Sequence, residues 1–281
     1  MIPPSTTTGK LPFWATIAQA YALPFEHIAA VLRITWAWAL LLALGTGLLY
    51  RLLDDTQIAA MQKGDDLGPA GLSLVSLLLG LIVGSSVAVG WHRLVLLDER
   101  PTGRTYLRLD NTVWGYIAVA GLLLVIMLPF LIAAFLMAQV GSEFTPKPGQ
   151  PPPEISGRYA LLFLALILGM VAAFLLTTRL ALVLPARAID DHTLSLGDSW
   201  RLTRGSFWRL FGGTLICYLP TLVLAAIFAG LLGNEGSGSS AYIASVMVSS
   251  MIGLVTSVFS LGYLALAYRH LVGRGAGTNS V

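Results

Sequence analysis

Six long stretches of this sequence contain no Asp, Glu, Lys or Arg, and this pattern decides what the chain can fold into. They are Ile34–Tyr50, Leu67–His92, Asn111–Ser142, Tyr159–Thr178, Leu210–Asn234 and Gly236–Tyr268. An α-helix rises 1.5 Å per residue, so it crosses a hydrocarbon core of about 30 Å with about 20 apolar residues. Five stretches reach that length. The first is shorter, but the apolar residues before Arg33 extend it, and Arg33 and Arg51 can reach the two headgroup layers.

The composition is also typical of an integral membrane protein. Only 11% of the residues are charged, and the mean hydropathy is +0.78. Membrane strands would alternate apolar and polar residues, which Leu122–Phe135 does not do. We therefore expect one all-α transmembrane domain over 1–281. Its predicted spans are about 28–50, 71–92, 113–138, 159–183, 210–232 and 242–268, with interfacial helices near 12–23 and 196–209.

The basic residues are distributed unevenly between the two sides of the membrane. With six spans both termini lie on one side, and 13 of the 17 Lys and Arg residues fall there, whereas the acidic residues divide evenly. The positive-inside rule then predicts cytoplasmic termini. The pI near 9.1 reflects this topology, so we expect no nucleic-acid partner. The single Cys217 allows no disulfide within the chain.

The chain also reads as three repeats of two spans each, approximately 12–97, 98–184 and 185–275. Each even-numbered span ends in an arginine: Arg93, Arg179 and Arg269. Rows of small residues along these spans predict close helix packing, because small side chains let helix backbones approach each other in lipid. The predicted contact positions are Gly80, Gly84, Gly169, Ala173, Ser249 and Gly253. We expect the even-numbered spans at the centre of the bundle, although abundant Gly, Ala and Ser could produce such rows without close packing.

The loop after the fourth span combines arginines with aromatic residues. Leu196, Trp200, Thr203, Phe207 and Phe211 recur at helical spacing after cap-like residues. This pattern is typical of a helix lying in the membrane interface. The candidate headgroup-binding residues are Arg201, Arg204, Arg209, Trp200, Trp208, Arg93, Arg179 and Arg269. The simpler interpretation is that they set topology and anchor the chain, because arginine and tryptophan gather at inner boundaries in general.

Catalytic and metal-binding motifs are missing from the sequence. None of the six stretches carries an ionisable Asp, Glu, Lys or Arg, and such groups usually mark proton and ion pathways. There is no HExxH, CxxC, Walker A or G-x-S-x-G motif. His27, His92, His192 and His270 fall on one side, but no two have i, i+4 spacing. We therefore expect no enzyme activity, no cofactor and no metal.

A resemblance to a known bacterial group rests on two segments. They are Leu184-Pro185-Ala186-Arg187-Ala188-Ile189-Asp190 and the run from Asp198 to Arg209. Over these residues the chain resembles the six-span membrane domain attached to some glycerophosphodiester phosphodiesterases, and related stand-alone inner-membrane proteins. The resemblance implies the fold and the inner-membrane location. It does not imply the phosphodiesterase activity, which resides in a separate soluble barrel whose Glu-Asn-Thr motif this chain lacks.

Two functions are consistent with the sequence. The first is a non-catalytic inner-membrane protein that engages lipid headgroups, or other membrane proteins, through its arginine- and aromatic-rich cytoplasmic loops. The alternative is a carrier or channel for an uncharged or amphiphilic solute, with a path between the even-numbered spans. A polar central cavity would favour the carrier, and a tight seam of Gly and Ser would favour the first function.

Overall fold

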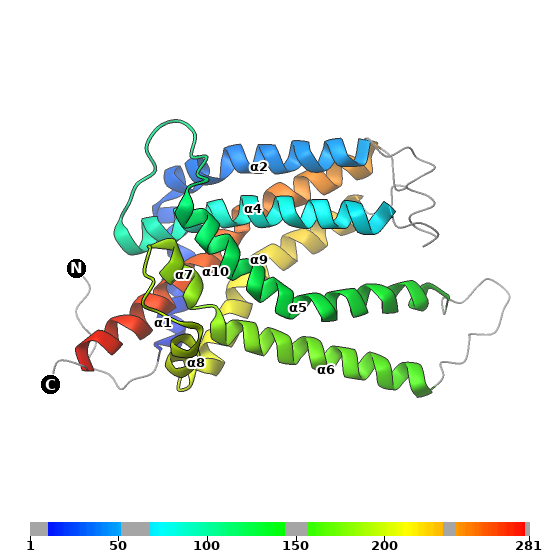
Figure 1. The fold of residues 1–281 in the computed structure, drawn as a ribbon. Coiled ribbons are helices and arrows are strands. Elements are labelled where there is room, and N and C mark those ends of the chain that lie inside the picture. The colour runs from blue at the N-terminus through cyan, green and yellow to red at the C-terminus, as the bar shows by residue number, and fades with distance from the viewer. Residues whose placement is uncertain (1–10, 52–67, 144–156, 233–239, 279–281) are drawn as a thin grey trace.

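The computed structural model describes residues 11–51, 68–143, 157–232 and 240–278, and in them the chain is a bundle of α-helices. Six helices are long and apolar enough to cross a membrane, which confirms the predicted all-α multi-pass fold (Figure 1). Each predicted span lies within or overlaps one of them. The six are α2 (Ile28–Arg51), α4 (Gly68–Leu97), α5 (Asn111–Glu143), α6 (Gly157–Leu180), α9 (Phe207–Leu232) and α10 (Ser240–Thr278).

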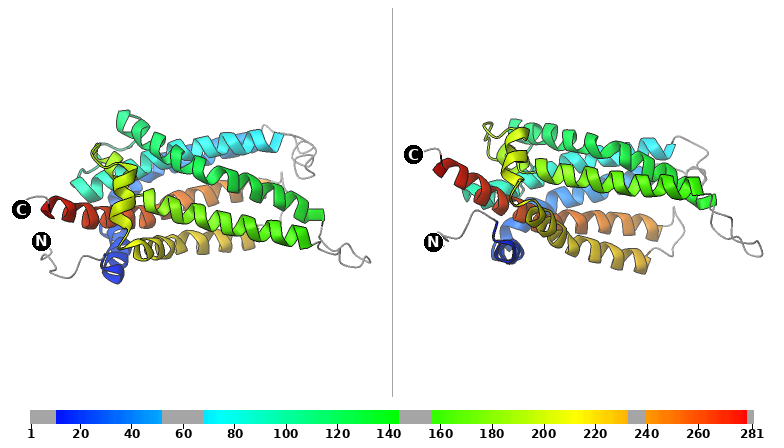
Figure 2. Two further views of the ribbon diagram at one scale, coloured as in Figure 1. Left: turned by 60° about the horizontal axis from the view of Figure 1, so that its bottom comes forward. Right: turned by 90° about the horizontal axis from the view of Figure 1, so that it is seen from below.

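Consecutive spans pair as antiparallel hairpins, and three short helices lie at one end of the bundle. The contacting pairs are α2 with α4, α5 with α6, and α9 with α10. The short helices are α1 (Phe13–Glu26), α7 (Val183–Ala188) and α8 (Leu196–Thr203). Figure 2 shows α1 running crosswise to the spans at this end. Together with the 98–110 loop, these helices form what we call the arginine-rich end.

The centre of the bundle differs from the expected one. α10 contacts α9, α2, α1 and α4, and its residues from Gly262 to Tyr268 are all buried. α6 contacts mainly α5, α8 and α9, and only 6% of its membrane-spanning window is buried inside the protein. The expectation that all even-numbered spans lie at the centre is therefore wrong for α6. Its outward-facing Leu and Phe side chains are as well solvated by lipid as by other apolar side chains, so burying them inside the protein would add little stability.

The largest buried cluster lies toward the arginine-rich end of the spans. Trp91 of α4 and Tyr263 of α10 are both fully buried there, together with residues of α1, α2, α7 and α9. Toward the opposite end, α5 and α6 present mostly exposed apolar side chains. The protein-to-protein packing that holds the bundle together is thus concentrated where its polar loops and short helices meet.

Candidate functional site at the arginine-rich end

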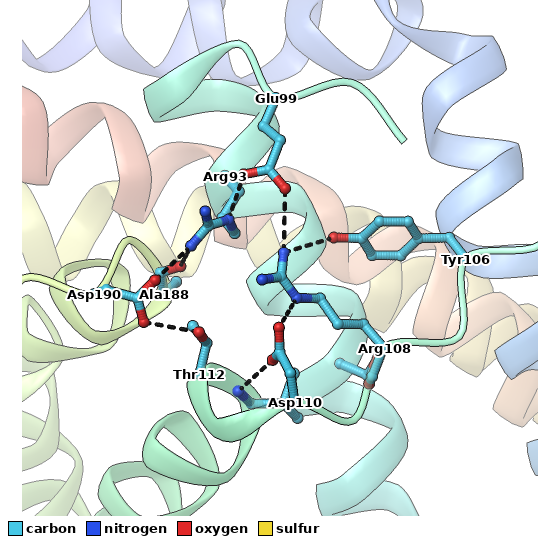
Figure 3. Close-up of polar contacts among 10 residues, drawn as sticks. Arg93, Glu99, Tyr106, Arg108, Asp110, Thr112, Ala188 and Asp190 are labelled. Carbon is cyan, nitrogen blue, oxygen red and sulfur yellow. Dashed lines mark hydrogen bonds and ion pairs between the residues drawn. The ribbon is translucent and has the colours of Figure 1, made fainter. Parts of the chain in front are cut away.

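Arg93 joins the end of α4 to the segment that follows α7. Its Nε donates a hydrogen bond to Glu99 Oε2 at 2.6 Å, and its Nη1 donates to Asp190 Oδ2 at 2.8 Å (Figure 3). The same Nη1 donates to the carbonyl oxygen of Ala188 at 3.3 Å. Only 15% of the side chain is exposed. Although Arg93 was a predicted headgroup-binding residue, the structure places it in an internal ion-pair network.

A second arginine extends this network across the 98–110 loop. Arg108 Nε donates to Asp110 Oδ2 at 2.5 Å, and its Nη1 contacts Glu99 Oε1 and the Tyr106 hydroxyl, each at 3.3 Å. Burial opposes the charged form, but the hydrogen bonds to Tyr106 and Asp110 raise the pKa of the Arg108 guanidinium above its ordinary value. Asp110 Oδ1 also accepts the backbone N–H of Val113, which caps the start of α5.

Asp190 connects the network to α5. Its Oδ1 accepts a hydrogen bond from the Thr112 hydroxyl at 2.7 Å, while its other oxygen faces Arg93. The Thr112 hydroxyl lowers the pKa of the Asp190 carboxyl, and the Arg93 guanidinium adds to this effect against the opposing effect of burial. With two guanidinium groups facing three carboxylates, the network carries more negative than positive charge, which suits a structural role and leaves little attraction for an anion.

The side chain of Arg179 also packs against other side chains of the protein instead of extending into solvent. Its guanidinium carbon lies 4.3 Å from the ring centroid of Trp200 and 4.7 Å from that of Phe207. The Ser199 hydroxyl donates to the Arg179 carbonyl oxygen at 2.6 Å. These contacts attach α8 to the end of α6 through cation–π attraction and a hydrogen bond.

A reciprocal cap begins α8. The Asp198 N–H donates to Ser195 Oγ and the Ser195 N–H donates to Asp198 Oδ2, each at 3.1 Å. Hydrogen bonds from Ser195, and then the contact with Arg201, lower the pKa of Asp198 to about 2. The cap-like residues seen in the sequence therefore do begin a helix. The predicted helix over 196–209 is too long, because α8 ends at Thr203 and α9 begins at Phe207, with a turn at Arg204–Ser206 where the chain redirects into the membrane.

The surface around this turn holds the predicted residues that remain accessible. We call Trp200, Arg201, Arg204, Trp208 and Arg209 the α8–α9 surface. All five are exposed, with Trp208 at 71%. Arg201 contacts Asp198 with most of its side chain in the open, and Arg209 Nη1 donates to the Leu11 carbonyl oxygen at 2.7 Å. Arg269 is exposed as well, but it lies on α10 outside this surface.

Helix α1 is anchored beside the α8–α9 surface. The Leu11 N–H donates to Ser206 Oγ at 3.2 Å, and the Tyr21 hydroxyl donates to the Ile216 carbonyl oxygen of α9 at 2.8 Å. Ile17, Ala20 and Leu23 are buried on one side. The interfacial helix predicted near 12–23 is present and extends to Glu26.

Three exposed tryptophans lie at the same end of the bundle. Trp14 of α1, Trp114 of α5 and Trp208 of α9 are each more than half exposed, and all three lie near helix starts at the arginine-rich end. Indole rings prefer the boundary between hydrocarbon and headgroups. The described tryptophans therefore indicate that this end of the bundle lies at a headgroup layer.

The predicted small-residue contacts have mixed outcomes. A Cβ atom built on Gly169 would overlap the ring of Phe130 in α5, and Ala173 is buried, so α6 does pack closely through this row. Ser249 is exposed. A Cβ built on Gly80, Gly84 or Gly253 meets no atom within 4 Å. At these three positions the expected tight seam is wrong, because the missing side chains leave open space instead of allowing the helix backbones to touch.

That space is part of a cavity of about 380 Å³ among α2, α4, α5 and α10, which we call the small-residue cavity. Its lining is formed by Leu42, Gly80, Leu81, Gly84, Ser85, Ala88, Tyr116, Ala120, Ser250, Gly253, Leu254, Ser257 and Leu261. Most of these side chains are apolar or very small. The lining therefore does not form the polar central cavity that would favour a carrier or channel for an uncharged or amphiphilic solute.

One buried polar side chain near this cavity has an unusual environment. His92 of α4 is fully buried, and neither ring nitrogen has a hydrogen-bond partner among the described residues. Leaving a buried polar atom without a partner costs about 1–3 kcal/mol. The ring centroid of Tyr116, which lines the cavity, lies 6.0 Å from that of His92.

Sequence reasoning missed most of the ion-pair network. Asp190 binds Arg93 and Thr112, while Asp191 accepts hydrogen bonds from Thr193 and Tyr268. The two carboxylates do face different partners, and Asp190 has a positive φ of 59°. The one signal available in the sequence was the Asp-Asn-Thr run at 110–112, which is typical of a helix start.

Comparison with known proteins gives one match. The family model described as a domain of unknown function, DUF7847, matches residues 37–271, which include all or part of each of the six spans. No curated protein and no solved structure matches the chain. The resemblance to the phosphodiesterase-associated membrane domain stays a prediction. Because the matched residues make up well over half of the chain, this multi-pass membrane protein belongs to the DUF7847 family.

Proposed function

We propose that the protein is a non-catalytic protein of the bacterial inner membrane whose arginine-rich end faces the cytoplasm and binds anionic lipid headgroups through the α8–α9 surface. The observation that carries this proposal is the exposure of Arg201, Arg204 and Arg209 beside two exposed tryptophans, Trp200 of α8 and Trp208 of α9. Tryptophan rings at the acyl boundary would hold the arginines at the level of the lipid phosphates.

The ion-pair network supports this assignment because it reduces the number of arginines that are free to bind lipid headgroups. The Nε and Nη1 groups of Arg93 and Arg108 donate to partners within the protein, and Arg179 is stacked on aromatic rings. Of the arginines predicted to bind headgroups, those of the α8–α9 surface and Arg269 remain accessible. A guanidinium group can form two parallel hydrogen bonds with phosphate oxygens, in addition to its charge.

The test is native mass spectrometry of lipid retained by the purified protein, with phosphatidylglycerol compared against phosphatidylethanolamine. In the triple variant Arg201→Gln, Arg204→Gln and Arg209→Gln, we expect retained phosphatidylglycerol to fall, because each near-surface charge contributes about 1 kcal/mol of attraction, or roughly fivefold in affinity. The matched control is Arg100→Gln with Arg104→Gln, two exposed arginines of the 98–110 loop outside the α8–α9 surface. Equal loss in both variants, or no loss in the triple-Gln variant, would contradict the proposal.

A triple-Lys variant tests whether lipid binding depends on the positive charge of these side chains or on the planar shape of the guanidinium group. If charge alone attracts the lipid, Arg201→Lys, Arg204→Lys and Arg209→Lys together leave phosphatidylglycerol retention at the wild-type level, and this is the result we expect. A clear loss would instead assign phosphate recognition to the planar guanidinium groups. Insertion into the membrane is measured separately for each variant.

A further inference from the structure

Helix α9 contains a proline inside its membrane-spanning part. Pro220 lies near the middle of the helix, which begins at Phe207 and ends at Leu232. Proline has no backbone N–H, so it cannot donate to the carbonyl oxygen four residues earlier, which here belongs to Ile216. A carbonyl group without a donor is costly within a membrane, because no water is present in the hydrocarbon core to replace the missing bond. The proline therefore creates an acceptor in α9 that another part of the protein has to satisfy.

The Tyr21 hydroxyl of α1 supplies the donor that α9 lacks. It donates a hydrogen bond to the Ile216 carbonyl oxygen at 2.8 Å. The Tyr21 ring also packs beside Phe259 of α10, with the two ring centroids 5.2 Å apart, which orients the hydroxyl. The hydrogen bond lost at Pro220 is thus replaced by a helix that runs crosswise to the spans (Figure 2).

Helix α1 is joined to α9 at a second place, before the proline. The Leu11 N–H donates to Ser206 Oγ at 3.2 Å, and Arg209 Nη1 donates to the Leu11 carbonyl oxygen at 2.7 Å. The contacts of Leu11 lie at the start of α9, whereas the contact of Tyr21 lies at the turn that ends in Pro220. Helix α1 therefore braces the first half of α9 from its start to the proline.

The half of α9 beyond the proline has an exposed apolar face. Leu222, Val223 and Ile227 are all exposed, and such side chains contact lipid in a membrane. Fluid lipid on this face can accommodate a change in the direction of the helix. Proline is the commonest cause of sharp kinks in helices, because the ring and the missing hydrogen bond weaken the turn before it.

We propose that α1 is a strap that controls the conformation of α9 at Pro220. While α1 is docked, the Tyr21 hydroxyl replaces the missing helix bond and holds the turn from Ile216 to Pro220 in one geometry. When α1 leaves this position, the Ile216 carbonyl loses its donor and α9 becomes free to bend at the proline. This device goes beyond the proposed headgroup binding and operates whether or not a lipid is bound at the α8–α9 surface.

A double-mutant cycle in the purified full-length protein tests the replaced bond. Tyr21→Phe removes only the hydroxyl, and Pro220→Ala restores an N–H four residues after Ile216. Reversible unfolding in mixed micelles of detergent and dodecyl sulfate gives the unfolding equilibrium constant. We expect Tyr21→Phe to raise this constant about fivefold or more when Pro220 is present, and less than about twofold in the Pro220→Ala background, where the new N–H satisfies the carbonyl. An equal effect in both backgrounds would overturn the proposal.

The matched control for this cycle is Tyr263→Phe. The Tyr263 hydroxyl also donates to a carbonyl oxygen of α9, that of Arg209, at 2.7 Å. The residue four positions after Arg209 is Gly213, which has a backbone N–H. The effect of Tyr263→Phe should therefore be the same with and without Pro220→Ala. A control that weakens as much as Tyr21→Phe in the Pro220→Ala background would refute the proline-specific role of Tyr21.

Spin labels on both sides of the proline test the bending of α9. In a cysteine-free background, one label is placed on α2 by Leu44→Cys and a second on α9, by Leu215→Cys before the proline or Ile227→Cys beyond it; all three side chains are exposed. Double electron–electron resonance measures the distance between the labels. Tyr21→Phe should broaden the distribution from position 44 to 227 and leave that from 44 to 215 unchanged, and Pro220→Ala should restore the narrow distribution. An unchanged 44-to-227 distribution in folded Tyr21→Phe would show that α1 does not control α9.

Discussion

Arg93 and Asp190 form an ion pair across 97 residues of sequence, with Arg93 Nη1 2.8 Å from Asp190 Oδ2. The pair connects the last turns of α4 to the segment between α7 and α8, and Thr112 brings the start of α5 to the same carboxylate. A single contact region therefore joins the first and second helical hairpins to the segment that leads to the third.

Removing the charge of Asp190 should destabilise the protein. In Asp190→Asn the side chain can still accept from Thr112 but no longer pairs with Arg93, whose side chain is mostly buried. We expect a loss of about 1–2 kcal/mol, seen as a lower melting temperature in detergent. The control is Asp98→Asn, because Asp98 has a similar positive φ of 53° but lies 3.7 Å from a well-exposed Arg100. Asn tolerates this backbone conformation at both sites, so equal melting temperatures for the two variants would refute the role of the pair.

The sequence alone could predict the spans but not this pair. A charge-free stretch of about 20 residues has few alternatives to a membrane helix, so the six spans follow from local composition. The start of α8 was likewise visible, because Ser195 and Asp198 stand at the spacing of a reciprocal cap. The partner of Arg93 depends on how three hairpins are arranged, and neither charge nor spacing near Arg93 indicates a carboxylate so distant in sequence.

The glycines also show that sequence spacing does not predict tertiary contacts. Helical spacing predicts which residues share a face, but not whether that face meets a neighbour or open space. Gly84 belongs to a regular small-residue row and borders a cavity, whereas Gly213 belongs to none of the predicted rows and lies directly beneath the ring of Tyr263.

Substituting these two glycines should give opposite results. A Cβ at Gly213 would overlap the Tyr263 ring, and that ring is held in place because its hydroxyl donates to the Arg209 carbonyl oxygen at 2.7 Å. We expect Gly213→Ala to cost about 1–3 kcal/mol. Gly84→Ala has free space and removes a flexible residue from a helix, so it should be neutral or stabilising by about 0.5–1 kcal/mol. Thermal unfolding in one detergent compares them, and a Gly84→Ala variant as unstable as Gly213→Ala would disprove the open cavity.

The cap of α8 should persist at low pH. The pKa of Asp198 is lowered to about 2 by Ser195 and then by Arg201, so its contribution to the cap is fully present above the ordinary carboxyl pKa. That contribution is lost as the pH falls through about 2. Carbon-13 NMR of labelled aspartate should detect this titration, and Arg201→Gln should move it upward. A titration of Asp198 at the ordinary value of about 3.9 would show that the cap does not form.

The orientation of the chain is open to a direct test by cysteine labelling. Cys217 is the one cysteine of the sequence and is fully buried, so the unmodified protein serves as the blank for a membrane-impermeant maleimide. Thr102→Cys places a thiol on the exposed 98–110 loop of the arginine-rich end. Gln150→Cys places one in the proline-rich segment between α5 and α6, which lies outside the described residues. Because most Lys and Arg residues fall on the side of Thr102, we expect Gln150→Cys to react in intact cells and Thr102→Cys to react only after the membrane is opened. The reverse pattern would place the α8–α9 surface at the outer leaflet and remove the basis for its proposed binding to cytoplasmic anionic lipid.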